Sequence, residues 1–166
     1  MIALDTNVLV RVLVGDDVRQ SQEARALVDR ALADQASLFV STVVLCEVVW
    51  VLRAGYRKSR AVLTESLLWL LATEQLEFER RSEVERALNA YAQGSGDFSD
   101  YLIREVARQH GARAVATFDR VLWQDAGFVS PDPATWGDEV SLQERPPSYG
   151  RRKRRRAHAT NPQSVS

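Results

Sequence analysis

Several kinds of functional machinery are missing from this chain of 166 residues. Its single cysteine, Cys46, excludes a disulfide framework and a cysteine metal site. The only two histidines, His110 and His158, are far apart in sequence, so histidine acid–base catalysis is not expected. There is no P-loop and no glycine-rich dinucleotide fingerprint. No apolar run reaches the roughly 18 residues of a membrane span, and no secretory signal is visible. The sequence therefore predicts a soluble, cytoplasmic protein.

The formal net charge of zero combines two regions of opposite sign. Residues 151–156 read Arg-Arg-Lys-Arg-Arg-Arg, and no acidic residue follows Glu144. Without these six positive charges, residues 1–150 contain 16 basic and 22 acidic residues, a formal charge of −6. The sequence predicts one globular domain over residues 1–143 and a basic, disordered tail over residues 144–166.

Short apolar segments alternate with helical periodicity along the predicted domain. The expected strands are 2–6, 37–40, 76–78, 113–118 and 128–129, and the expected helices after the first strand include 18–34, 42–54, 59–73, 82–92 and 99–110. This alternation predicts an α/β fold with a mostly parallel sheet of four or five short strands, flanked by helices. Ligands of such sheets gather beyond the carboxyl ends of the strands.

Four carboxylates end or interrupt apolar segments: Asp5, Glu47, Asp100 and Asp119. Asp5 and Asp119 both fall at the ends of predicted strands, whereas Glu47 lies within a helix that is apolar nearly all round. Burying an unpaired carboxylate costs several kcal/mol, so we expect the four acids to share one site with a compensating cation. Ligand sets made of oxygen select hard cations, which predicts Mg²⁺, or alternatively Mn²⁺.

Each carboxylate also has an ordinary structural explanation. Asp5 precedes a helix and can serve as its N-cap, and Glu47 can form a buried salt bridge with an arginine. Asp97 and Asp100 have the spacing of a helix capping box. Asp119 begins a loop, where a solvated aspartate is common. The four coincidences together favour a shared site over four separate explanations.

Four segments resemble the acidic motifs of PIN-domain nucleases, in the order of that family. They are 1–11, 41–52, 97–103 and 116–120, which contain Asp5, Glu47, Asp100 and Asp119 in turn. The resemblance is closest to VapC-type toxins of bacterial toxin–antitoxin pairs. It implies a PIN-like fold and an Mg²⁺-dependent endoribonuclease, which hydrolyses RNA through a metal-activated water. It also implies a small cognate antitoxin that inhibits the enzyme, and a homodimer.

The resemblance assigns catalytic and metal-binding roles by matching position. Asp5 and Asp100 are the implied direct metal ligands. Glu47 is implied to hold a metal-bound water or a second ion, and Asp119 to complete the site. The neighbouring polar residues expected to orient these acids by hydrogen bonds are Thr6 and either Ser41 or Thr117, and Asp97 is a possible supporting residue or helix cap.

Three questions stay open at the level of the sequence. The alternative to an enzyme is a catalytically silent PIN-like module that binds RNA or a protein, although such members usually lack acidic residues that are present here. The basic run 151–156 is not part of the family pattern, and it either contacts RNA phosphates or is a solvated tail. Helices 42–54 and 59–73 carry much apolar surface, which either forms the antitoxin and dimer contacts or is buried within the monomer.

Overall fold

The computed structural model describes residues 1–137 and residue 140. The predicted domain end at residue 143 and the predicted tail lie outside the described residues. The elements are β1 (Ile2–Ala3), α1 (Thr6–Val14), α2 (Val18–Ala33), β2 (Leu38–Val40), α3 (Thr42–Ala54), α4 (Arg60–Ala72), β3 (Leu76–Phe78), α5 (Arg81–Gln93), α6 (Phe98–Gln109), β4 (Val115–Ala116), the 3₁₀ helix η1 (Leu122–Gln124), β5 (Phe128–Val129) and the 3₁₀ helix η2 (Pro133–Thr135). None of the helices in this part of the chain is long and apolar enough to cross a membrane.

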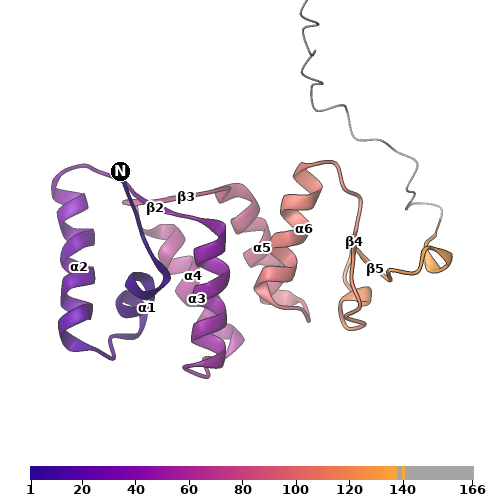
Figure 1. Cartoon of the computed structure of the whole chain (residues 1–166), viewed down its shortest axis with the longest axis horizontal. Coiled ribbons are helices and arrows are strands. Elements are labelled where there is room, and N and C mark those ends of the chain that lie inside the picture. The colour runs from indigo at the N-terminus through magenta and orange to yellow at the C-terminus, as the bar shows by residue number, and fades with distance from the viewer. Residues whose placement is uncertain (138–139, 141–166) are drawn as a thin grey trace, which may run out of the picture.

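The short strands form two parallel sheets, which confirms the predicted α/β class. The first sheet has the order β1-β2-β3, with Leu38 of β2 opposite both Ile2 and Leu76. The second pairs β4 with β5, with Val115 opposite Phe128. In Figure 1, α5 and α6 lie between the first sheet and the β4–β5 pair, and α2 lies at the opposite end of the molecule. Because each sheet is parallel, the segments that follow its strands emerge at one edge.

Serine caps fix the start of α3 and α4. The hydroxyl oxygen of Ser41 accepts a hydrogen bond from the backbone N–H of Val44 at 3.3 Å. Ser59 accepts one from Val62 at 3.4 Å in the same way. Each cap satisfies an N–H group that has no partner within its own helix. Because α3 starts directly after β2, its second turn carries Glu47 close to the edge of the first sheet.

The core is formed by leucine, valine and aromatic side chains from the first sheet and from α1, α3, α4, α5 and α6. Its most buried members include Leu9, Val40, Leu45, Val48, Leu63, Leu70, Val84 and Phe98. Helices α3 and α4 each have a buried face and an exposed apolar face. Trp50 of α3 is 68% exposed and Trp69 of α4 is 52% exposed. Burial within the monomer therefore accounts for only part of the apolar surface of these two helices.

Candidate active site

A hydrogen bond joins the first two acidic segments. Thr6 is the first residue of α1, and its Oγ1 donates to Oε2 of Glu47 at 2.5 Å. Thr6 is buried and Glu47 is exposed, so the Thr6 hydroxyl holds the Glu47 carboxylate at the surface of the protein. This confirms the expected orienting role of Thr6. The bond also ties the end of β1, where Asp5 lies, to α3.

Helix capping does not account for Asp5. This residue stands at the N-cap position of α1, but its side chain makes no capping hydrogen bond. Its carboxylate is exposed, and Nδ2 of Asn7 lies 3.5 Å from Oδ2, which is a long contact. The Asp5 carboxylate therefore keeps its oxygen atoms available for a ligand.

Asp100 lies in the first turn of α6 and takes part in the capping interaction that its spacing predicts. Its Oδ2 accepts a hydrogen bond from the backbone N–H of Asp97 at 2.8 Å. The side chain of Asp97 forms an ion pair with Arg53, which lies in the last turn of α3. Asp97 thereby ties the start of α6 to α3, beside Asp100.

Asp119 lies in a tight turn directly after β4. Its backbone N–H donates to Oγ1 of Thr117 at 3.0 Å, and its Oδ1 accepts from the backbone N–H of Val121 at 2.9 Å. Thr117 therefore holds the backbone of Asp119 and not its carboxylate, while Ser41 acts as a helix cap and orients no acid. The same turn ends β4 at Ala116, before the predicted end at residue 118.

Asp100 and Asp119 lie close enough for one charge to affect the other. Burial raises the pKa of Asp100 above its ordinary value, the negative charge of Asp119 raises it further, and Arg53 opposes both effects. Burial also raises the pKa of the Cys46 thiol, with a smaller contribution from the charge of Asp100. A protonated thiol is a poor metal ligand, whereas two adjacent carboxylates attract a cation.

Gly96 allows the third and fourth acidic segments to approach each other. A Cβ atom at this position would lie 2.2 Å from Cδ2 of Leu122, which is buried in η1, and 3.3 Å from Oδ2 of Asp100. The N–H of Gly96 donates to the hydroxyl of Tyr101 at 3.0 Å, and that hydroxyl donates to Asp125. The loop before α6 thus packs directly on the segment that follows β4.

The expectation that all four carboxylates are buried is wrong. Three of them are exposed and only Asp100 is half-buried. The apolar pattern of α3 wrongly suggested that Glu47 is buried. Glu47 lies on the same face of α3 as two apolar residues that are themselves exposed, Val43 (74% exposed) and Trp50 (68% exposed). The alternative of a buried salt bridge is also wrong, since Glu47 is exposed and accepts its hydrogen bond from a threonine.

The chemistry of the donors fits a hard cation, although a closed ligand cage is not formed. Within the described residues, no group of three or more Asp, Glu, His or Cys side chains is arranged to hold a metal ion. Instead, the Thr6–Glu47 hydrogen bond joins the segment of Asp5 to that of Glu47. Asp100 and Asp119 form a second pair, which is close enough for the charge of one to affect the other. All four donors are carboxylates, the ligand type that Mg²⁺ and Mn²⁺ prefer.

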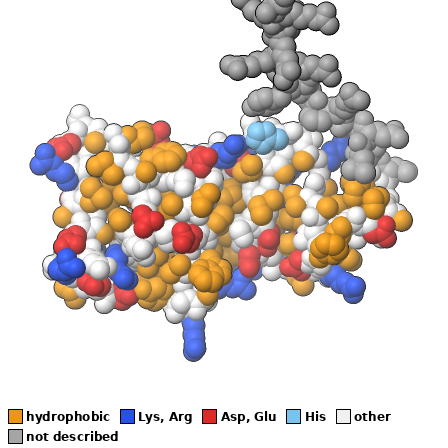
Figure 2. Space-filling view, viewed as in Figure 1, with side chains coloured by type: hydrophobic (Ala, Val, Ile, Leu, Met, Phe, Trp, Pro, Cys, Tyr) orange, Lys and Arg blue, Asp and Glu red, His pale blue; other side chains and the backbone are white. Residues whose placement is uncertain are grey.

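An apolar groove of about 590 Å³ runs between α3 and α6. Cys46 and Ser99 line it, and these residues directly precede Glu47 and Asp100 in the sequence. Figure 2 shows that hydrophobic side chains cover much of one face of the molecule, with acidic and basic side chains scattered between them. The acids therefore border an apolar surface as well as solvent.

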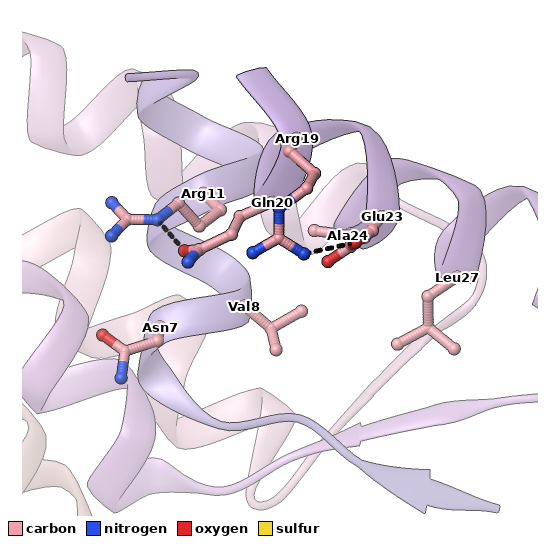
Figure 3. Close-up of a pocket in the computed structure, with 8 residues that line it drawn as sticks. All are labelled: Asn7, Val8, Arg11, Arg19, Gln20, Glu23, Ala24 and Leu27. Carbon is pink, nitrogen blue, oxygen red and sulfur yellow. Dashed lines mark hydrogen bonds and ion pairs between the residues drawn. The ribbon is translucent and has the colours of Figure 1, made fainter. Parts of the chain in front are cut away.

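A second hollow, of about 380 Å³, lies between α1 and α2 (Figure 3). Its two arginines already have partners. Nε of Arg11 donates to Oε1 of Gln20 at 2.6 Å, and Arg19 forms an ion pair with Glu23 at 2.8 Å. Asn7 also lines this hollow, but none of the four acids does. We assign no chemistry to it.

Glu79 is a supporting residue that the sequence analysis missed. Its Oε2 accepts hydrogen bonds from the backbone N–H and the hydroxyl of Thr42, both at 2.9 Å. The hydrogen bond from the Thr42 backbone is the main reason that the pKa of Glu79 lies below its ordinary value. Glu79 thereby anchors the start of α3, which carries Glu47. Its position after the third parallel strand is the signal that points to the same sheet edge.

Comparison with known proteins decides the family. A family model described as PIN domain matches residues 2–128. The chain belongs to the PIN domain family. The match confirms the predicted PIN-like fold, and all four acidic segments lie within it apart from residue 1. A VapC ribonuclease of Aquifex aeolicus (strain VF5) is 27% identical to this PIN domain protein over 130 residues, which cover 78% of this chain and 95% of the relative. No solved structure matches significantly.

Proposed function

We propose that this PIN domain protein is a metal-dependent endoribonuclease toxin that a cognate antitoxin inhibits. The observation that carries the proposal is that the four acidic segments meet in two pairs, one through the Thr6–Glu47 hydrogen bond and the other through the neighbouring charges of Asp100 and Asp119. The relative that is named a VapC ribonuclease supports the same activity. Three of these carboxylates are exposed, so an RNA strand can reach them.

Each acid receives a distinct task in this proposal. Asp5 and Asp100 would hold Mg²⁺, or Mn²⁺, directly. Glu47 would contribute to holding this ion or a second one, and Asp119 would complete the site. A bound divalent cation supplies an activated water at neutral pH and stabilises the charge that develops on the phosphate. Thr6 keeps the Glu47 carboxylate in place, since its hydroxyl donates to that group at 2.5 Å.

The proposed reaction is hydrolysis by in-line attack of water on the RNA phosphodiester. Water, and not the ribose 2′-hydroxyl, attacks the phosphorus, and the bond from phosphorus to the 3′-oxygen breaks, so the products carry a 5′-phosphate and a 3′-hydroxyl. The proposal is tested by incubating the purified full chain with RNA and Mg²⁺ and identifying the product ends. Asp5→Asn should lose about 100-fold or more of the activity, since even partners of metal ligands are worth about 10- to 100-fold.

A matched substitution on the surface completes this experiment. Asp29 is an exposed aspartate on α2, so Asp29→Asn removes the same charge without touching the site. It should cleave RNA like the wild type. Cleavage that persists in excess EDTA would contradict the mechanism. RNA binding without cleavage by the wild-type chain would instead identify a catalytically silent binding module.

We infer that the exposed apolar faces of α3 and α4 form the antitoxin and dimer contacts. Trp50, Leu68 and Trp69 are each more than half exposed, although such large apolar side chains are usually buried. Light scattering of the full chain measures its mass in solution. A monomer at high concentration that binds no amphipathic helix would contradict this inference. The cytoplasmic location stays a prediction.

The basic run 151–156 is proposed to contact RNA phosphates, although it lies outside the described residues. Six cations near an acidic domain would weaken its repulsion of RNA and increase the salt dependence of binding. Deleting residues 151–166 should lower both RNA affinity and the slope of affinity against salt concentration. Unchanged values would mean that the run has no part in RNA binding.

A further inference from the structure

The turn that carries Asp119 also exposes two aromatic side chains. Phe118 directly precedes Asp119 and is 87% exposed, although a phenyl ring gains most from burial. Trp123 follows in η1 and is 40% exposed. Large apolar groups exposed next to a functional acid commonly mark a contact with a ligand or partner. The mechanism described above uses neither ring.

These rings are carried on an ordered turn. Nε1 of Trp123 donates a hydrogen bond to the backbone carbonyl of Thr117 at 2.9 Å, which fixes the indole beside the residue that precedes Phe118. Leu122, the neighbour of Trp123, is only 1% exposed and anchors η1 in the core. The Asp119 carboxylate holds the same turn through the N–H of Val121. The aromatic faces are thus presented on a fixed base next to the acidic site.

A positive charge lies beside the exposed aromatic side chains, and this combination is suited to binding a nucleic acid strand. The guanidinium of Arg120 lies 5.9 Å from the centroid of the Trp123 ring, within the range of a cation–π contact. A hollow of about 230 Å³ continues from Trp123 to Trp136, whose Nε1 donates to the carbonyl of Ser130 at 2.7 Å. Aromatic faces with an adjacent cation match a strand that alternates planar bases with phosphates.

We propose that Phe118 and Trp123 form a stacking surface for unpaired RNA bases beside the scissile phosphate, with Arg120 contacting a neighbouring phosphate. The inference rests on the proposed nuclease function and assigns base and phosphate contacts to these three residues. Bases within a duplex are already stacked and paired, so they do not offer their faces to these rings. An aromatic pair adjoining Asp119 and a cation favours RNA over a protein partner.

The test measures binding of a fluorescent single-stranded RNA of about 12 nucleotides, a length that one such groove can hold. The full chain carries Asp5→Asn throughout, so that bound RNA is not cut. Phe118→Ala should weaken binding by about 5- to 100-fold, the value of stacking one base on an aromatic ring. Phe118→Trp should retain affinity, whereas Phe118→Leu should behave like the alanine variant.

Two controls separate stacking from general apolar contact. Leu32 is an exposed apolar residue of α2 (55% exposed), and Leu32→Ala should leave RNA affinity unchanged. An abasic strand with the same number of phosphates should bind the wild type and Phe118→Ala equally. Phe118 is exposed, so its removal leaves the core intact, and Trp123→Phe tests the second ring while keeping an aromatic side chain.

Two results would overturn the proposal. Phe118→Ala binding single-stranded RNA as tightly as its Asp5→Asn parent would assign the rings to a protein contact instead. An equal loss on the normal and abasic strands would show that bases are not involved. Failure of the nuclease proposal is distinguishable, since the chain without Asp5→Asn would then cut no RNA.

Discussion

Replacing Thr6 by valine removes one hydroxyl from the candidate site and little else. Valine keeps the branched shape of threonine, and position 6 is 4% exposed, so the side chain remains packed in the same space. The hydroxyl that disappears is the donor to Oε2 of Glu47 at 2.5 Å. The exposed Glu47 carboxylate then loses the contact that fixes its orientation.

The expected effect follows from this geometry. A hydrogen bond to a charged group contributes about 1.5–3 kcal/mol when its loss leaves the charge without a partner. Water can reach the exposed Glu47, so we expect about 1–1.4 kcal/mol, which corresponds to about a 5- to 10-fold loss of kcat/KM. The unfolding free energy should fall by about 1 kcal/mol, the net contribution of one hydrogen bond, because valine fills the space of threonine and leaves no buried polar group unpaired.

The assay combines RNA cleavage rates in Mg²⁺ with urea unfolding of each variant. Thr6→Ser retains the hydroxyl and should keep most of the activity. Thr64 provides a matched control, since its Oγ1 donates to the carbonyl of Arg60 at 2.9 Å within α4, away from the acids. Thr64→Val should cleave at the wild-type rate. Full activity of Thr6→Val would refute the role of this hydrogen bond in holding Glu47.

Two further predictions concern supports of the site. Glu79 has a lowered pKa, so it stabilises the folded chain above the pKa of an unfolded glutamate, and this effect is lost as pH falls through the folded value. Urea unfolding should show Glu79→Gln to be about 1 kcal/mol less stable than wild type at pH 7, with the difference vanishing in acid; a constant difference would contradict the hydrogen bonds to Thr42. Gly96→Ala should cost about 1–3 kcal/mol, since its Cβ would meet buried Leu122. Gly137→Ala, where a Cβ meets nothing within 4 Å, should be neutral, and equal stability of both variants would contradict the packing.

The sequence predicted most elements of the fold because their local signals are strong. The predicted helices 42–54 and 59–73 form as α3 and α4, and residues 76–78 form the expected strand. Strand β4 is shorter than predicted, because the side chain of Thr117 bonds the backbone N–H of Asp119 and turns the chain. Apolar periodicity shows where a strand can form, but it does not show the residue at which a turn ends the strand.

The positions of the four acids after strands and within helices identified them in the sequence. The exposure of three of their side chains was not predicted. Exposed apolar neighbours of Glu47 made its helix look buried on all sides, and a single sequence gives no sign of which apolar face stays exposed. The ion pair of Arg53 with Asp97 joins residues 44 positions apart in sequence, and no local pattern predicts it. Such long-range contacts depend on how α3 and α6 pack.

Expression of the wild-type chain and of Asp5→Asn in a bacterial host, with sequencing of captured 5′ ends from total RNA, tests the central claim most directly. The account predicts growth arrest and discrete new 5′-phosphate ends with the wild type alone, at sites in unpaired RNA. Soluble wild-type protein that causes neither arrest nor new ends would contradict it.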